Sequence, residues 1–184
     1  MSNSSDLTIL QLFKSGNICL KNNLQLPSLI LMYSSIDILG WMAFGDLPVK
    51  KRFTKWIDQF MDSNNYGKIS SLDIYGARCA VLHTMTPQSL LSKKNQVKEL
   101  FYSWGDASSD ALTKIYKLVN CRGCVTLHVD SLFKEVEHGY EKFLDLKEYA
   151  EYKLKRKRTQ YIDIEKVLIY KVIKKATNME NILI

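Results

Sequence analysis

The apolar stretch at residues 28–44 constrains the fold of this 184-residue chain more than any other feature. Pro27 stands just before it, where proline favours the first turn of a helix, and a turn sequence ending in Pro48 follows it. The stretch has about 17 residues, fewer than a membrane span normally needs, and carries Asp37 at its centre, where a carboxylate is costly in lipid. It is therefore predicted to be a core helix, and no integral membrane segment is expected.

Asp37 is the only residue in this predicted helix that carries a charge at neutral pH. A buried carboxylate is costly unless it is paired or hydrogen-bonded. Arg78, in a later predicted helix, is the natural partner of Asp37 if the two helices are neighbours. Contact between the two side chains is therefore expected.

Other segments show the apolar spacing of three and four residues that is typical of amphipathic helices. A first helix is expected from about Leu7 to either Gly16 or Leu20. A third is expected over residues 49–61, with an apolar stripe and a basic outer side, and a fourth begins after Ser70. Mostly short connections between these four segments favour an antiparallel bundle.

Two short segments, residues 99–104 and 124–129, have the composition of strands and are expected to pair antiparallel. Asp130 is then expected to cap a long helix that continues to about Leu154, and residues 161–175 are expected to form a final helix. The fold class is therefore mainly α. A helical domain over residues 1–150, with a small β-hairpin or two-strand insertion, would precede a basic C-terminal helical extension over residues 151–184.

The fourth predicted helix carries Arg78 and His83, five residues apart. Ser70 and Asp73 have the spacing of a capping box at its start, and Pro87 disfavours helical geometry just after it. Five residues along a helix correspond to about 140° of rotation and about 7.5 Å of rise, so the two side chains converge only because arginine is long and the helix soon ends. His83 is therefore expected at an exposed helix C-terminus.

The segment from Arg78 to His83 matches the R-x-x-x-x-H signature of the HEPN superfamily, and the chain resembles that family over about residues 5–150. Members are small helical proteins that are often metal-independent ribonucleases. The resemblance implies a HEPN-like bundle, a homodimer, and an endoribonuclease site that needs no cofactor or metal. Many members have a polar residue where this chain has Cys79, and a non-catalytic dimer that binds RNA or protein is the alternative.

The two motif residues suit RNA cleavage. Histidine exchanges protons near neutral pH, and the fork of arginine matches phosphate oxygens. One histidine cannot readily serve as both base and acid, so the resemblance implies a composite site with Arg78 and His83 from two subunits. Tyr75, one turn before Arg78, is a supporting residue that either approaches the site or packs in the core.

The chain has a net charge of +7, which favours polyanionic partners such as RNA. The densest basic run lies in the C-terminal extension and is the expected RNA-binding segment: Lys153, Lys155, Arg156, Lys157 and Arg158. Tethering to an anionic membrane and a merely solvated helix are alternatives for this run. A toxin or defence role would add an antitoxin protein to the partners.

The polar N-terminus lacks the pattern of a signal peptide, so a cytoplasmic protein with four reduced cysteines is expected. Cys121, Cys124 and His128 have plausible zinc-ligand spacing, but no fourth ligand lies nearby and two incidental cysteines at a turn are the favoured interpretation. Gly76, inside the fourth helix, indicates a close backbone neighbour, either in a second subunit or in a helix of the same chain.

Overall fold

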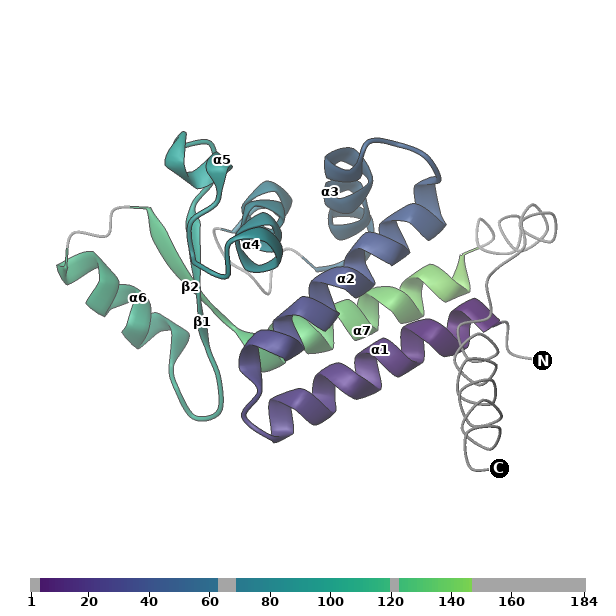
Figure 1. The fold of residues 1–184 in the computed structure, drawn as a ribbon, viewed down its shortest axis with the longest axis horizontal. Helices are drawn as coiled ribbons and strands as arrows, with labels where there is room; N and C mark the ends of the chain where they lie inside the picture. Colours follow the sequence, from purple (N-terminus) through teal and green to yellow (C-terminus); the bar gives the residue numbers. More distant parts are fainter. Residues whose placement is uncertain (1–3, 63–68, 120–122, 147–184) are drawn as a thin grey trace, which may run out of the picture.

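The computed structural model describes residues 4–62, 69–119 and 123–146, and their secondary structure is mainly helical (Figure 1). The elements in chain order are α1 (Ser4–Lys21), α2 (Gln25–Phe44), α3 (Val49–Phe60), α4 (Ser71–His83), α5 (Leu90–Lys93), β1 (Glu99–Ser103), α6 (Ser109–Leu118), β2 (Cys124–His128) and α7 (Val129–Asp145). The prediction of a mainly α fold with a small β element is confirmed. The predicted extension over residues 151–184, with its final helix and basic run, lies outside the described residues.

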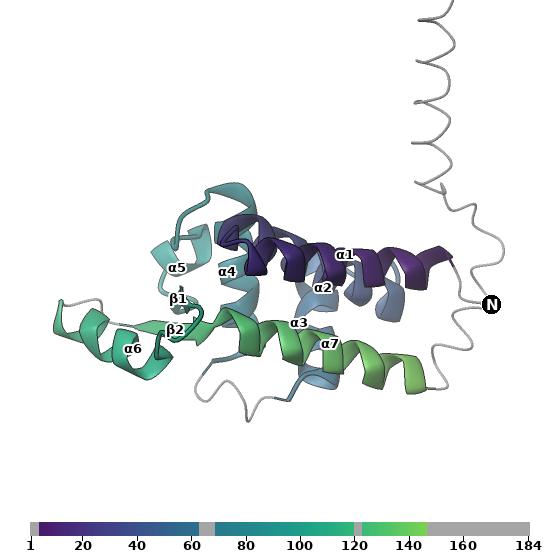
Figure 2. The ribbon, with the colours of Figure 1, turned by 90° about the horizontal axis from the view of Figure 1, so that it is seen from below.

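The long helices α1, α2 and α7 lie along the longest axis of the molecule, and α3 and α4 run across them (Figures 1 and 2). Between these helices lies one hydrophobic core. Its largest fully buried side chains include Trp56 and Phe53 of α3, Tyr33 of α2 and Phe143 of α7. The amphipathic stripe predicted for α3 is therefore confirmed as its core face.

Helix α2 runs through the middle of the fold, with nine buried residues spread around it. A helix that is apolar on all sides is expected in a core or in a membrane. By length and composition α2 is the one described helix able to cross a membrane, and half of its apolar stretch is buried inside this fold. Its observed end at Phe44, followed by Gly45, agrees with the predicted break.

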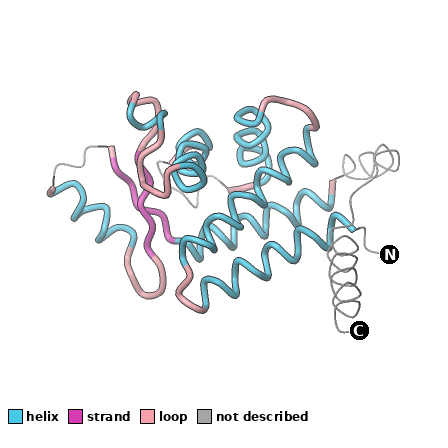
Figure 3. The backbone as a smooth tube through the Cα atoms, in the orientation of Figure 1, coloured by secondary structure: helices cyan, strands magenta, loops and turns pink. Residues whose placement is uncertain are grey.

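The two strands form a parallel pair, with Glu99 opposite Cys124 and Ser103 opposite His128 (Figure 3). The prediction of antiparallel pairing is therefore wrong. The segment between the strands forms α6, which returns the chain to the starting end of β1 and so makes the second strand run in the same direction as the first.

Helix boundaries differ from the predictions in three places. Helix α1 continues to Lys21, and α2 begins at Gln25, which puts Pro27 at its third residue. Helix α7 starts at Val129, so Asp130 lies in its first turn, and His128 occupies the capping position, where its side chain makes no capping hydrogen bond. The helix ends at Asp145, earlier than predicted. In that first turn, the carboxylate of Asp130 still complements the helix dipole.

Gly76 lies against Val97, in the segment that leads into β1. A Cβ atom at Gly76 would lie 2.6 Å from Val97 Cγ2, well inside van der Waals contact. The close neighbour is therefore a side chain of the same subunit, and neither the second-subunit nor the helix-backbone interpretation of this glycine holds. Glycine at this position allows α4 to approach the β1 segment closely.

Candidate functional site

Helix α4 is fixed at both ends. At its start, Asp73 N donates to Ser70 Oγ at 3.1 Å and the Asp73 carboxylate accepts from Ser70 N at 2.9 Å, which confirms the predicted capping box. Asp73 also accepts from the backbone N of Lys98 at 2.7 Å, which ties the start of α4 to the β1 segment. At its end, His83 is the last helical residue and is exposed, as predicted.

Arg78 and Asp37 form the predicted ion pair between α4 and α2. Arg78 Nε donates to Asp37 Oδ2 at 2.8 Å, and Arg78 Nη2 donates to the same oxygen at 2.5 Å. The side chains are only 15% and 17% exposed, respectively. Two charge-assisted hydrogen bonds at a mostly buried position hold the guanidinium plane in one orientation.

The third nitrogen of the guanidinium reaches His83: Arg78 Nη1 lies 3.2 Å from His83 Nε2. Arginine has no acceptor atom, so a hydrogen bond in this contact runs from Nη1 to Nε2. The five-residue spacing therefore does bring the two side chains together, as predicted. The arrangement is a chain of contacts from Asp37 through Arg78 to His83.

The environment of Arg78 favours its charged form. Burial alone would lower the pKa of Arg78, but the hydrogen bonds and the charge of Asp37 oppose that effect, and the net shift of the pKa is upward. The guanidinium is therefore a permanent cation at any physiological pH. It can stabilise negative charge but cannot transfer a proton.

Tyr75 packs in the core beside this site. Its ring meets Phe53 edge-on, with the ring centroids 5.5 Å apart. Burial, and then the neighbouring thiol of Cys79, raise the pKa of Tyr75 above its ordinary value. The phenol therefore stays protonated near pH 7, and its ring contributes to core packing; the supporting role at the site stays a prediction.

The cysteine segment does not form the predicted set of reduced thiols. Cys124 is disulfide-bonded, whereas Cys19 and Cys79 are free. His128 Nε2 lies 2.9 Å from the carbonyl oxygen of Gly105, to which it donates. Among the described residues no group of three histidine, cysteine or acidic side chains lies close enough to hold a metal ion.

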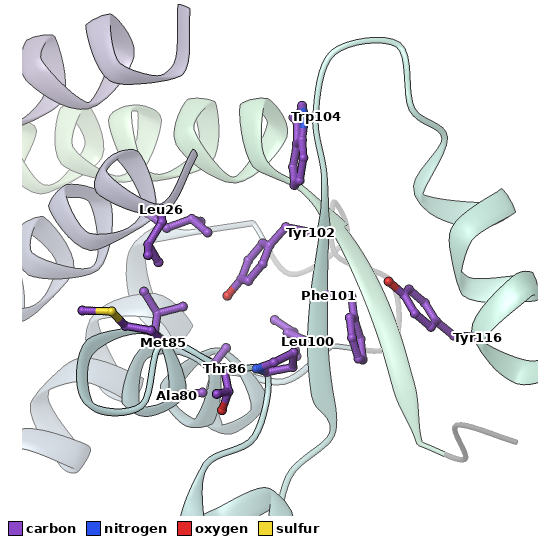
Figure 4. Close-up of a pocket in the computed structure, with 13 residues that line it drawn as sticks. Leu26, Ala80, Met85, Thr86, Leu100, Phe101, Tyr102, Trp104 and Tyr116 are labelled. Carbon is purple, nitrogen blue, oxygen red and sulfur yellow. The ribbon is translucent and has the colours of Figure 1, made fainter. Parts of the chain in front are cut away.

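A cleft of about 270 Å³ lies between α2, α4 and β1, and no prediction from the sequence pointed to it (Figure 4). Its walls come from the start of α2, the second half of α4, the turn after α4, strand β1 and Tyr116 of α6. Tyr102 points from β1 into the space between Leu26 and Met85. The signal in the sequence is the aromatic run Phe101, Tyr102 and Trp104, a composition that is equally typical of a strand.

Of the predicted site residues, the structure brings together Asp37, Tyr75, Arg78 and His83. The five basic residues from Lys153 to Arg158 lie outside the described part of the chain. Fold and site together define a mainly helical protein in which a mostly buried arginine contacts an exposed histidine at the end of one helix. No protein-family model, curated protein or solved structure matches the chain.

Proposed function

We propose that the protein is a metal-independent endoribonuclease with a HEPN-like antiparallel bundle, acting in the cytoplasm as a homodimer. The observation that carries the proposal is the contact of Arg78 with His83 at an exposed helix end, with Arg78 anchored by Asp37. A fixed cation beside an imidazole supplies the charge stabilisation and the proton transfer that RNA cleavage needs.

In the proposed reaction, His83 of one subunit takes the proton from a 2′-hydroxyl, whose oxygen attacks the adjacent phosphorus. The bond from phosphorus to the 5′-oxygen breaks, and the protonated His83 of the second subunit gives that oxygen its proton. Arg78 donates hydrogen bonds to the phosphate oxygens as their negative charge increases. The products are a 2′,3′-cyclic phosphate and a 5′-hydroxyl.

Asp37 is a positioning residue in this proposal. Its carboxylate accepts hydrogen bonds from Nε and Nη2 of Arg78, which leaves Nη1 of Arg78 directed toward His83. A phosphate oxygen that replaces Nε2 of His83 as the acceptor of Nη1 would free the imidazole lone pair to act as a base. Substrate binding would thus prepare the base in the same step that binds the phosphate.

The test is incubation of the purified protein with total RNA in the presence of EDTA, followed by analysis of the product ends. Cleavage to 2′,3′-cyclic ends is expected, and Arg78→Ala and His83→Ala should each remove about 10² or more of the rate. His138→Ala is the matched control, because His138 is an exposed helical histidine whose side chain, within the described part of the chain, pairs with Glu141. Dimers with His83→Ala in one subunit should also be impaired, and full activity of those dimers would refute the shared site.

A non-catalytic RNA-binding or protein-binding dimer is the second candidate. The observation in its favour is that His83 Nε2 already accepts a hydrogen bond from Arg78, which keeps the lone pair from a substrate proton. The same assay separates the two functions. Retention of RNA in a gel without cleavage selects the binder, whereas cleavage that His138→Ala preserves and His83→Ala abolishes selects the enzyme.

A further inference from the structure

The cleft between α2, α4 and β1 has an apolar interior and an open mouth. Its deep walls include Leu29, Ala80 and Leu100, each 5% exposed or less, whereas Met85 and Trp104 at the mouth are 69% and 45% exposed. None of the residues that line the cleft carries a charge at neutral pH. A charged group inside it would lose its hydration without gaining a counter-charge, so the occupant is expected to be uncharged.

The volume of the cleft sets the size of the occupant. A cavity of about 150 Å³ with apolar walls can hold benzene, and pockets for drug-sized ligands begin at about 300 Å³. At about 270 Å³, this cleft lies between the two and has room for one or two fused rings. Aromatic side chains of Phe101, Tyr102, Trp104 and Tyr116 are part of its lining, and their flat faces suit a ring.

The hydroxyl of Tyr102 supplies a hydrogen-bond donor inside the cleft. It lies 2.5 Å from the hydroxyl of Tyr33, and either group could donate in that contact. Tyr33 is fully buried and, within the described part of the chain, its hydroxyl has no other partner. Tyr33 therefore donates, because otherwise its own hydrogen would be unpaired in the core. The hydrogen of the Tyr102 hydroxyl is then left over, and this side chain points into the space between Leu26 and Met85 (Figure 4).

Met85 is held at the mouth of the cleft in an unusual backbone conformation. Its φ is 52°, in the left-handed region that residues other than glycine rarely adopt. Hydrogen bonds from the Thr84 and Thr86 hydroxyls to the carbonyl of Gln88, at 3.1 and 3.2 Å, fix this turn. Backbone strain of this kind is concentrated at ligand sites, and a thioether adapts its shape to an aromatic ring and contacts it favourably.

We propose that this cleft binds a small, uncharged molecule of one or two aromatic rings that carries a hydrogen-bond acceptor. The acceptor, a ring nitrogen or a carbonyl oxygen, receives the hydrogen of the Tyr102 hydroxyl, and the rings lie against the apolar walls. An aromatic side chain of a protein partner has a similar shape, but its peptide groups would lie against apolar walls without hydrogen bonds. The site is independent of the proposed nuclease, because Arg78 and His83 do not line the cleft.

The test is an NMR titration of the full chain with carbon-13 in its methionine methyl groups. The probes are quinoline, naphthalene and N-methylquinolinium: naphthalene has the shape of quinoline without the ring nitrogen, and N-methylquinolinium carries a permanent charge. At neutral pH, quinoline is expected to bind with a Kd below about 1 mM, within the range for a ligand of its size. Its ring protons should show nuclear Overhauser effects to the methyl group of Met85 and none to that of Met61, which is buried at the end of α3.

Two hydroxyl substitutions separate the acceptor bond from apolar burial. One neutral hydrogen bond corresponds to about 2- to 10-fold in affinity, so the parent protein should bind quinoline that much more tightly than naphthalene. Tyr102→Phe should abolish this difference and leave naphthalene binding unchanged. Tyr33→Phe is the matched control, because it removes the buried partner but keeps the Tyr102 hydroxyl, and the preference for quinoline should remain. Circular dichroism checks the fold of each variant.

Equal affinity of the parent protein for quinoline and naphthalene would overturn the proposal, as would equal affinity for quinoline and N-methylquinolinium, or no binding of quinoline at about 1 mM. Contacts to Met61 without contacts to Met85 would refute the cleft as the site. Tighter binding of N-acetyltryptophanamide than of quinoline would instead assign the cleft to a side chain of a protein partner. The comparison of probes on the parent protein needs no variant, so the proposal can fail even if Tyr102→Phe does not fold.

Discussion

Removal of the Asp37 carboxylate should destabilise the protein by leaving Arg78 as an unpaired, mostly buried cation. Asp37 Oδ2 accepts two hydrogen bonds, from Arg78 Nε and Nη2, and both side chains are less than a fifth exposed. Breaking a fully buried pair costs about 3–5 kcal/mol. The residual exposure of Arg78 lets some water reach the guanidinium, so we expect Asp37→Ala to lower the free energy of unfolding by about 2–3 kcal/mol.

A double substitution separates the cost of an unpaired charge from the value of the pair. Asp37→Leu combined with Arg78→Met replaces both charges with apolar groups of similar size, and such replacements of buried pairs are often neutral or stabilising. The double variant should therefore be more stable than Asp37→Leu alone. Asp37 Oδ1 is buried without a hydrogen-bond partner, so its removal takes away an existing desolvation cost.

Urea unfolding followed by circular dichroism gives both free energies, and the RNA cleavage assay is run on the same samples. The double variant should be folded but inactive, because it lacks the guanidinium. An Asp37→Ala variant as stable as the parent protein would refute the buried-pair reasoning. A double variant less stable than Asp37→Leu alone and than Arg78→Met alone would show that the ion pair contributes net stability.

Two further predictions concern the core. Gly76→Ala should lower the free energy of unfolding by about 1–3 kcal/mol because the added Cβ would overlap Val97 Cγ2, although alanine is the better helix former. In urea unfolding, Val97→Ala in the same chain should recover most of this loss. A Gly76→Ala protein as stable as the parent would contradict the close approach. Burial raises the pKa of Tyr33 and of Tyr102, so above about pH 10 the unfolded phenols ionise while the folded ones do not, and stability should fall as pH rises. Tyr33→Phe with Tyr102→Phe should flatten that fall in unfolding titrations from pH 9 to 11, and an unchanged slope would contradict it.

The sequence was sufficient for the features that depend on local chemistry. The capping box of Ser70 and Asp73 and the end of α4 at His83 are set by residues within a few positions of each other. The pair of Asp37 and Arg78 is a tertiary contact, yet it was predictable, because an isolated carboxylate in an apolar helix needs a cation and Arg78 was a suitable one.

The direction of β2 and the cleft were not predictable in the same way. The composition of β1 and β2 suits parallel and antiparallel pairing equally well. Which of the two forms depends on whether the segment between the strands forms a helix. That segment, α6, has no buried residue, so its apolar positions gave no clear sign of how it packs. The neighbour of Gly76 was also missed, because a glycine indicates a close approach without indicating which segment approaches.

Helix α4 joins the ion pair to the rest of the fold, since it carries Arg78 toward α2 and lines the neighbouring cleft with Ala77, Ala80 and Val81. The rotation of this helix is fixed by three contacts: Asp37 with Arg78, Asp73 with the backbone of Lys98, and Gly76 with Val97. A side chain at position 76 would push α4 away from the β1 segment and would thus alter the cleft as well as the ion pair. We therefore expect Gly76→Ala to slow the proposed RNA cleavage even under conditions where the variant is fully folded, whereas destabilisation of the core far from α4 would leave cleavage by the folded protein unchanged.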